Sequence, residues 1–317
     1  MGNIKEKKIH IAKEDVEGQG QLRPEMLLDH LQNIAMEQSE ELGLGIEFLE
    51  RENLNWLLLC YKINIERMPS VSEGILVRTW ASSFSKMFAR REFLMLDSKG
   101  NILIEASTKW LLTEGDTHKI KKIDDMFYDA YGVDRDKKDE RGFKKLRLPE
   151  NNLMTGRKKS EERDIDFNGH VNNTRYIAWA MESLPEEFRR DNILYEIDIE
   201  FKKEILLGED IEVLSEVKTD GEAVIILQEL RKENKETACC INTVWKRREF
   251  VCYCSHVTKR DIEQAVDRGA SSVEEVIEMT GAMKNSNCKV NNPKGRCCRK
   301  DIEAVFENYR KQEGIEV

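Results

Sequence analysis

The first regular pattern of apolar residues along the chain begins after Pro24. Apolar side chains recur three or four positions apart, at Leu27, Leu28, Leu31, Ile34 and Ala35. This spacing places them on one face of a helix. Pro24 suits the first helical position, and Gly43 can end the helix. The sequence therefore predicts an amphipathic helix here, preceded by a short strand at His10–Glu14.

Four strand-like runs rich in β-branched and aromatic residues follow this helix. They are Trp56–Arg67, Ile75–Phe84, Phe88–Asp97 and Ile102–Thr113. Pro69 stops the first run, and Ser98–Asn101 provides a hairpin turn between the last two. A helix followed by antiparallel strands predicts a sheet wrapped around the helix.

The second half of the chain repeats this pattern. A predicted helix at Thr174–Leu184 precedes four more runs, at Leu194–Phe201, Glu209–Thr219, Ala223–Lys232 and Glu236–Arg247. Such a repeat predicts two similar subdomains in tandem. The charge-rich connector between them, 114–163, is interpreted as a solvated linker, with a docking surface for an acidic partner as the alternative.

The composition changes after Arg248. The remaining segment holds five of the eight cysteines and three short helical patterns, at Lys259–Asp267, Val273–Thr280 and Asp301–Arg310. So short a segment has little core of its own and needs a staple such as a metal. We therefore expect three parts: 1–145, 146–250 and 251–317.

Charge and composition narrow the classes of function. The net charge of -9 argues against nucleic-acid binding. No apolar run reaches the ~18 residues of a membrane span, and no signal-peptide pattern is present, so we expect a cytoplasmic protein without a membrane partner. In that reducing compartment, eight cysteines indicate a metal site rather than disulfides.

Three residues with catalytic chemistry alternate before the second predicted helix: Asp166, Asn168 and His170. If this loop is extended, they share one side. An imidazole can move a proton near neutral pH, an amide can donate to an oxyanion, and a carboxylate can fix the imidazole tautomer. Asn172 or Asn173 can cap the helix that follows. The same residues are also typical of an ordinary turn, and their spacing alone does not distinguish a turn from a catalytic site.

This stretch resembles the active-site segment of the fatty acyl-ACP thioesterases, D-x-N-x-H-V-N-N followed by Y-I-x-W and E-S. The matching residues are Asp166, Asn168, His170, Val171, Asn172, Asn173, Tyr176, Ile177, Trp179, Glu182 and Ser183. The resemblance covers about the first 250 residues. It implies an α+β double hot-dog fold, in which two antiparallel sheets each wrap a central helix. It also implies hydrolysis of a fatty acyl thioester to free fatty acid and holo-ACP in fatty acid biosynthesis.

The segment Glu200–Glu204 resembles the family's E-Y-R-R-E, which implies that Glu204 is the catalytic base. The alternative is that Glu204 is a surface residue without a catalytic role. Plant members often carry a cysteine at the next position, but Ile205 stands here. We therefore expect direct attack by water, activated by Glu204 and Asp166. The other cysteines of this region lie in apolar strands and are interpreted as buried small hydrophobes: Cys60, Cys239 and Cys240.

The C-terminal segment resembles the bacterioferritin-associated ferredoxin-like 2Fe-2S domain, whose pattern is C-x-C, V-T, G-A-x-(S/T)-x-E-E-V, T-G-A and two further cysteines. The matches run from Cys252 and Cys254 through Thr280-Gly281-Ala282. The resemblance implies a 2Fe-2S cluster held by Cys252, Cys254, Cys288 and Cys298. A structural zinc on the same thiolates is the alternative cofactor. Cys298 is preferred to Cys297 because Ile302 then takes an apolar position in the helix that follows.

Together these patterns predict an acyl-ACP thioesterase whose partner is an acyl carrier protein. The alternatives are a non-catalytic acyl-ACP-binding redox or iron sensor and a hot-dog acyl-CoA thioesterase or hydroxyacyl dehydratase. A redox partner and a homodimer are further expectations.

Overall fold

The computed structural model describes residues 2–314 apart from 19, 116, 118, 137–141, 152, 167 and 285. The chain forms two compact units, Met1–Lys246 and Arg247–Val317. Within the described residues, no helix is both long and apolar enough to cross a membrane.

The first unit consists of two halves that share an edge strand, a 3-10 helix, two helices and four long strands in the same order, and the first half also contains β2, β3 and α3. The first half contains β1 (Lys5–His10), η1 (Lys13–Asp15), β2 (Val16–Glu17), β3 (Gln21–Leu22), α1 (Pro24–Glu41), α2 (Ile46–Arg51), β4 (Leu54–Ile65), β5 (Gly74–Phe84), β6 (Phe88–Leu96), β7 (Ile102–Glu114) and α3 (Asp125–Tyr131). The second half contains β8 (Met154–Lys159), η2 (Glu162–Asp164), α4 (Asn173–Glu182), α5 (Glu186–Asp191), β9 (Asn192–Phe201), β10 (Asp210–Asp220), β11 (Ala223–Lys232) and β12 (Thr237–Arg247).

All ten long strands belong to one sheet, in the order β1-β5-β6-β7-β4-β9-β12-β11-β10-β8. Each half supplies five neighbouring strands with matching connectivity, which confirms the predicted α+β class and its internal repeat. The expected two sheets are continuous, because β4 pairs with β9 from Cys60↔Glu200 to Asn64↔Glu196. This pairing satisfies backbone groups that two separate sheets would leave exposed at their edges.

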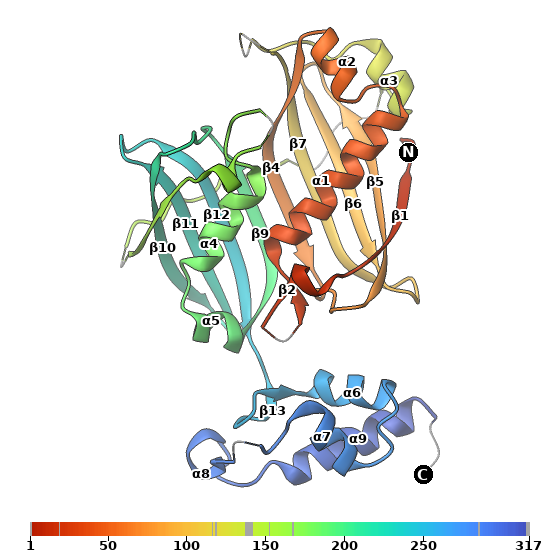
Figure 1. Ribbon diagram of the computed structural model, residues 1–317, viewed down its shortest axis with the longest axis vertical. Coiled ribbons are helices and arrows are strands. Elements are labelled where there is room, and N and C mark those ends of the chain that lie inside the picture. The colour runs from red at the N-terminus through yellow and green to blue at the C-terminus, as the bar shows by residue number, and fades with distance from the viewer. Residues whose placement is uncertain are drawn as a thin grey trace. The chain divides into compact units, whose positions relative to one another are not determined.

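The two long helices lie across this sheet, α1 over the strands of the first half and α4 over those of the second (Figure 1). The apolar face predicted for α1 is buried: Leu27, Leu28 and Leu31 are each 0% exposed. Removing one such side chain from water stabilises the fold by roughly 1.5–3 kcal/mol. Helix α4 buries Ile177 and Ala180 in the same core. The buried faces of the two helices therefore anchor them to the sheet and fix the position of the loops that lead into them.

The edges of the sheet differ from the prediction. The expected strand at His10–Glu14 is wrong, since β1 ends at His10 and a short 3-10 helix follows. Strand β8 at the other edge was not predicted. Both edge strands are rich in lysine, KEKKIH and MTGRKK, so they lack the apolar run that marks an inner strand. Charged edges of this kind protect a sheet from pairing with other chains.

The second unit contains β13 (Phe250–Cys252), β14 (Val257–Thr258), α6 (Lys259–Asp267), α7 (Val273–Thr280), α8 (Cys288–Asn291) and α9 (Arg299–Gln312). The predicted bounds of α6 and α7 are confirmed, and their caps explain why. The Thr258 and Ser272 side chains accept hydrogen bonds from backbone N–H groups in the first turns, and Gly281 ends α7 with a φ of +70°. Its small core includes Cys252, Cys254 and Cys298.

Candidate active site and cysteine cluster

His170 and Glu204 meet although they lie far apart in the sequence. His170 precedes α4, and Glu204 lies in the loop between β9 and β10. The imidazole Nε2 is 3.0 Å from the Glu204 Oε2, and the two side chains are 29% and 42% exposed. A carboxylate beside an imidazole, both accessible to water, forms a pair that can accept and pass on a proton.

Asp166 shapes the turn that carries His170. Its Oδ1 accepts hydrogen bonds from the backbone N–H groups of Asn168 (2.8 Å) and His170 (3.4 Å). The Asp166 N–H donates to the His170 carbonyl at 2.8 Å, and Gly169 has a φ of +82°, which favours glycine. The segment is therefore a closed turn instead of the extended loop considered from the sequence. The carboxylate of Asp166 faces backbone amides.

Asn168 lies at the exposed tip of this turn. Its side-chain amide has no hydrogen-bond partner among the described residues, and the neighbouring position 167 lies outside them. The amide is therefore available to a bound molecule.

The Tyr176 hydroxyl holds the backbone on both sides of Glu204. It accepts a hydrogen bond from the Ile205 N–H at 3.1 Å and donates to the Lys203 carbonyl at 3.4 Å. The Val171 N–H donates to the Ile205 carbonyl at 2.8 Å, which joins the histidine turn to the same loop. Sequence reasoning missed this role of Tyr176, whose only signal was its place in the Y-I-x-W motif.

The start of α4 is capped as predicted. The Asn172 side chain accepts a hydrogen bond from the Thr174 N–H at 2.9 Å, and the Asn172 N–H donates to the Asp164 carbonyl at 2.8 Å. The positive end of the helix dipole therefore lies next to the turn that carries His170.

Cysteine chemistry is disfavoured in this unit. Burial raises the pKa of both Cys60 and Cys240 to about 11 and raises that of Cys239 well above its usual value. These thiols are protonated at neutral pH and therefore poor nucleophiles. Position 205, next to Glu204, holds an isoleucine and offers no thiol either. The imidazole of His170 and the carboxylate of Glu204 are therefore the candidate reactive groups.

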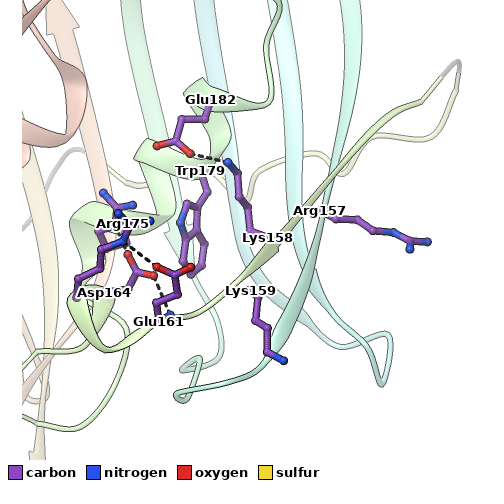
Figure 2. Close-up of a pocket in the computed structure, with 9 residues that line it drawn as sticks. Arg157, Lys158, Lys159, Glu161, Asp164, Arg175, Trp179 and Glu182 are labelled. Atoms are coloured by element: carbon purple, nitrogen blue, oxygen red, sulfur yellow. Dashed lines mark hydrogen bonds and ion pairs between the residues drawn. The ribbon is translucent and has the colours of Figure 1, made fainter.

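A pocket of about 460 Å³ lies between β8, η2 and α4 (Figure 2). Its lining includes five cations and three carboxylates: Arg157, Lys158, Lys159, Arg163, Arg175, Glu161, Asp164 and Glu182. Arg175 contacts Asp164 at 2.7 Å, and Lys158 contacts Glu182 at 2.6 Å. Figure 2 shows Arg157 and Lys159 extending away from these ion pairs.

The cysteines of the second unit form two close pairs. The sulfurs of Cys254 and Cys288 are 3.8 Å apart, and Cys298 hydrogen-bonds Cys252. The backbone N–H of Met283 donates to the Cys252 sulfur, and that of Asn287 to the Cys254 sulfur. Burial, followed by the hydrogen bond with Cys252, raises the pKa of Cys298 to about 12.

This arrangement of two thiol pairs fits a two-iron cluster. A 2Fe-2S cluster takes two thiolates on each iron, whereas a structural zinc needs four ligands around one point. In the described part of the chain, no group of three or more His, Cys, Asp or Glu side chains converges on one ion. Cys298 is buried, whereas Cys297 is exposed.

Both halves of the first unit and the second unit each match a known protein family. Residues 2–131 match the acyl-ACP thioesterase N-terminal domain, and residues 154–247 match its C-terminal domain. Residues 250–308 match the BFD-like [2Fe-2S] binding domain.

Related proteins agree with these matches. The chain is 26% identical to an oleoyl-acyl carrier protein thioesterase of Arabidopsis thaliana over 64% of this chain and 58% of that protein. It is 30% identical to an acyl-[acyl-carrier-protein] hydrolase of Cuphea viscosissima, over 62% of this chain and 51% of that protein. The chain therefore spans only 58% and 51% of the length of these relatives.

Solved structures show the same fold. An acyl-ACP thioesterase from Bacteroides thetaiotaomicron superposes with a TM-score of 0.68 at 23% identity, over 77% of this chain and 98% of that one. A 12:0-ACP thioesterase from Umbellularia californica gives a TM-score of 0.66 at 20% identity, over 77% and 98%. The predicted hot-dog fold is confirmed.

Proposed function

Since the chain belongs to the acyl-ACP thioesterase family and carries a BFD-like [2Fe-2S] binding domain, we propose that it hydrolyses fatty acyl-ACP to free fatty acid and holo-ACP. The observation that carries this proposal is the 3.0 Å contact between His170 and Glu204, within the segments that resemble the family's active site. Both groups are open to water, which is the second substrate.

The geometry supports a route without a covalent enzyme intermediate. Glu204 accepts a proton from water as the water oxygen attacks the thioester carbonyl carbon. The carbon–sulfur bond then breaks, and His170 donates a proton to the leaving sulfur. The contact between the two side chains returns the proton from Glu204 to His170. The Asn168 amide, which has no partner among the described residues, is suited to donate to the oxyanion. Asp166 acts by holding the turn.

The test is release of free thiol from acyl-ACPs of different chain length by the purified full chain. We expect release well above the uncatalysed rate, and parallel assays with acyl-CoA and hydroxyacyl thioesters separate the rival activities. A protein that binds acyl-ACP without releasing thiol would be the non-catalytic sensor. Loss of water from a hydroxyacyl chain without thiol release would identify a dehydratase.

We further propose that Cys252, Cys254, Cys288 and Cys298 hold one 2Fe-2S cluster. Such a cluster exchanges single electrons, whereas thioester hydrolysis moves none, so it has no step to perform in the hydrolysis. We propose that the second unit regulates the enzyme by redox or iron status; a structural role and a docking site for a redox partner are the alternatives. The protein purified without oxygen is expected to contain about two irons and two sulfides per chain. Cys298→Ser should lose this iron and Cys297→Ser should keep it. One zinc per chain, or equal loss in both variants, would contradict this ligand set.

A further inference from the structure

The loop that carries Glu204 exposes two neighbouring apolar side chains. Leu206 is 48% exposed and Leu207 is 54% exposed, although the adjacent Ile205 is fully buried. Ile205 contributes to the core, whereas Leu206 and Leu207 do not. Exposed apolar residues beside a candidate catalytic group are typical of a surface that a partner covers.

Three cations lie on segments next to these leucines in the chain or in the structure. Arg157 and Lys159 lie on β8, and Lys203 precedes Glu204; all three are exposed. Among the described residues none of the three forms an ion pair, although Asp210 is the cross-strand neighbour of Lys159. Arg157 and Lys159 alternate with Lys158, so both lie on the face of β8 opposite to the Lys158–Glu182 pair.

Hydrogen bonds hold the leucine loop against the end of β8. The Ser160 hydroxyl donates to the Leu206 carbonyl at 2.6 Å. The Gly208 N–H donates to the Ser160 carbonyl at 3.2 Å, and the Ser160 N–H donates to the Glu209 carbonyl at 3.1 Å. The apolar pair and the cations of β8 therefore belong to one connected surface, which begins two residues after Glu204.

We propose that Leu206, Leu207, Arg157, Lys159 and Lys203 form the docking surface for the acyl carrier protein. This inference rests on the proposed function. The carrier is acidic, and this chain has a net charge of -9, so attraction requires a local group of unpaired cations. An apolar centre with a charged rim is the usual anatomy of a protein interface. Docking here brings the thioester to the loop that holds Glu204.

The test separates docking from chemistry. Binding is measured by fluorescence anisotropy with a labelled ACP that carries its acyl chain through a non-hydrolysable amide. Arg157→Glu/Lys159→Glu is expected to weaken binding about tenfold or more, since like charges then face the carrier. It should also reduce the salt dependence of binding. The matched control is Lys8→Glu on β1, the opposite edge of the same sheet; Lys8 is exposed and forms no ion pair with any residue that the structure describes.

Hydrolysis of a neutral substrate provides the second measurement. With acyl-N-acetylcysteamine, which has no carrier protein, the charge-reversed variant should keep the wild-type kcat/KM. Leu207→Ser should likewise weaken ACP binding and leave kcat/KM for acyl-N-acetylcysteamine unchanged. Equal binding by all variants, or equal loss in Lys8→Glu, would overturn the docking surface. Normal ACP binding without hydrolysis of either substrate would refute the hydrolase and leave the docking surface supported.

Discussion

The two halves of the first unit share their strand connectivity and several backbone hydrogen bonds but carry very different side chains at the matching positions. In each half a three-residue 3-10 helix ends at an aspartate, Asp15 or Asp164. The Asp15 carbonyl accepts from the Arg23 N–H at 2.9 Å, as the Asp164 carbonyl accepts from the Asn172 N–H at 2.8 Å. The chain then enters α1 or α4. The frame that carries the histidine turn is thus present twice.

The loop that carries Glu204 also has a counterpart. The Leu22 N–H donates to the Pro69 carbonyl at 2.8 Å, as the Val171 N–H donates to the Ile205 carbonyl at 2.8 Å. Counting back one residue from each of these four positions pairs Gln21 with His170 and Met68 with Glu204. The first half therefore has an amide and a thioether where the second has an imidazole and a carboxylate. The same backbone frame therefore carries side chains that can move a proton in the second half, and carries none at the two matching positions of the first.

The largest expected effect comes from replacing the imidazole and the carboxylate of the second half by amides, which cannot take over the proton transfer. His170→Gln and Glu204→Gln should each lower kcat by about 100-fold or more, the scale of acid–base catalysis. The matched changes Gln21→Leu and Met68→Leu should leave kcat unchanged. Thioester hydrolysis and thermal melting of all four variants provide the measurement. Full activity in either variant of the second half would remove that residue from the site.

A smaller effect is expected from the tyrosine that holds the Glu204 loop. Tyr176→Phe removes the acceptor of the Ile205 N–H and frees the backbone on both sides of Glu204. We expect kcat to fall about tenfold to 100-fold, because small displacements of a catalytic group are costly. Steady-state kinetics with a pH–rate profile can separate this positioning role from general loss of fold. Tyr195→Phe, on β9 with its ring against Lys246, is the control and should behave as the wild type.

The smallest effect concerns stability in the first half. Arg91 is buried, burial lowers its pKa, and its guanidinium donates to the side chains of Gln38 and Thr79. Gln38→Leu leaves this buried cation without its amide acceptor and should lower the free energy of unfolding by about 1–3 kcal/mol. Urea denaturation measures the change, and activity per folded molecule should persist. A loss of kcat comparable to that of Glu204→Gln would show that the first half takes part in the chemistry.

Local features of this protein follow from the sequence alone. The apolar faces of α1 and α4, the bounds of α6 and α7 and most inner strands were predicted, because spacing and caps act over a few residues. Residue chemistry also made His170 a candidate, whereas Glu204 and the four cysteine ligands were selected by their resemblance to family motifs. The lysine-rich strands β1 and β8 were not predicted, because they have no apolar pattern of their own. They form strands by pairing with β5 and β10.

Tertiary structure alone decided how distant segments meet. The pairing of β4 with β9 joins the halves into one sheet, and the hydrogen bonds of Tyr176 and Val171 bring the Glu204 loop to the histidine turn. The closed turn gave Asp166 backbone partners where an extended loop would have aimed it elsewhere. The pairing of the cysteines likewise depends on the packing of α9 against β13 and on the approach of α8 to the turn that follows β13. These contacts depend on the packing of segments far apart in the chain, which no local periodicity encodes.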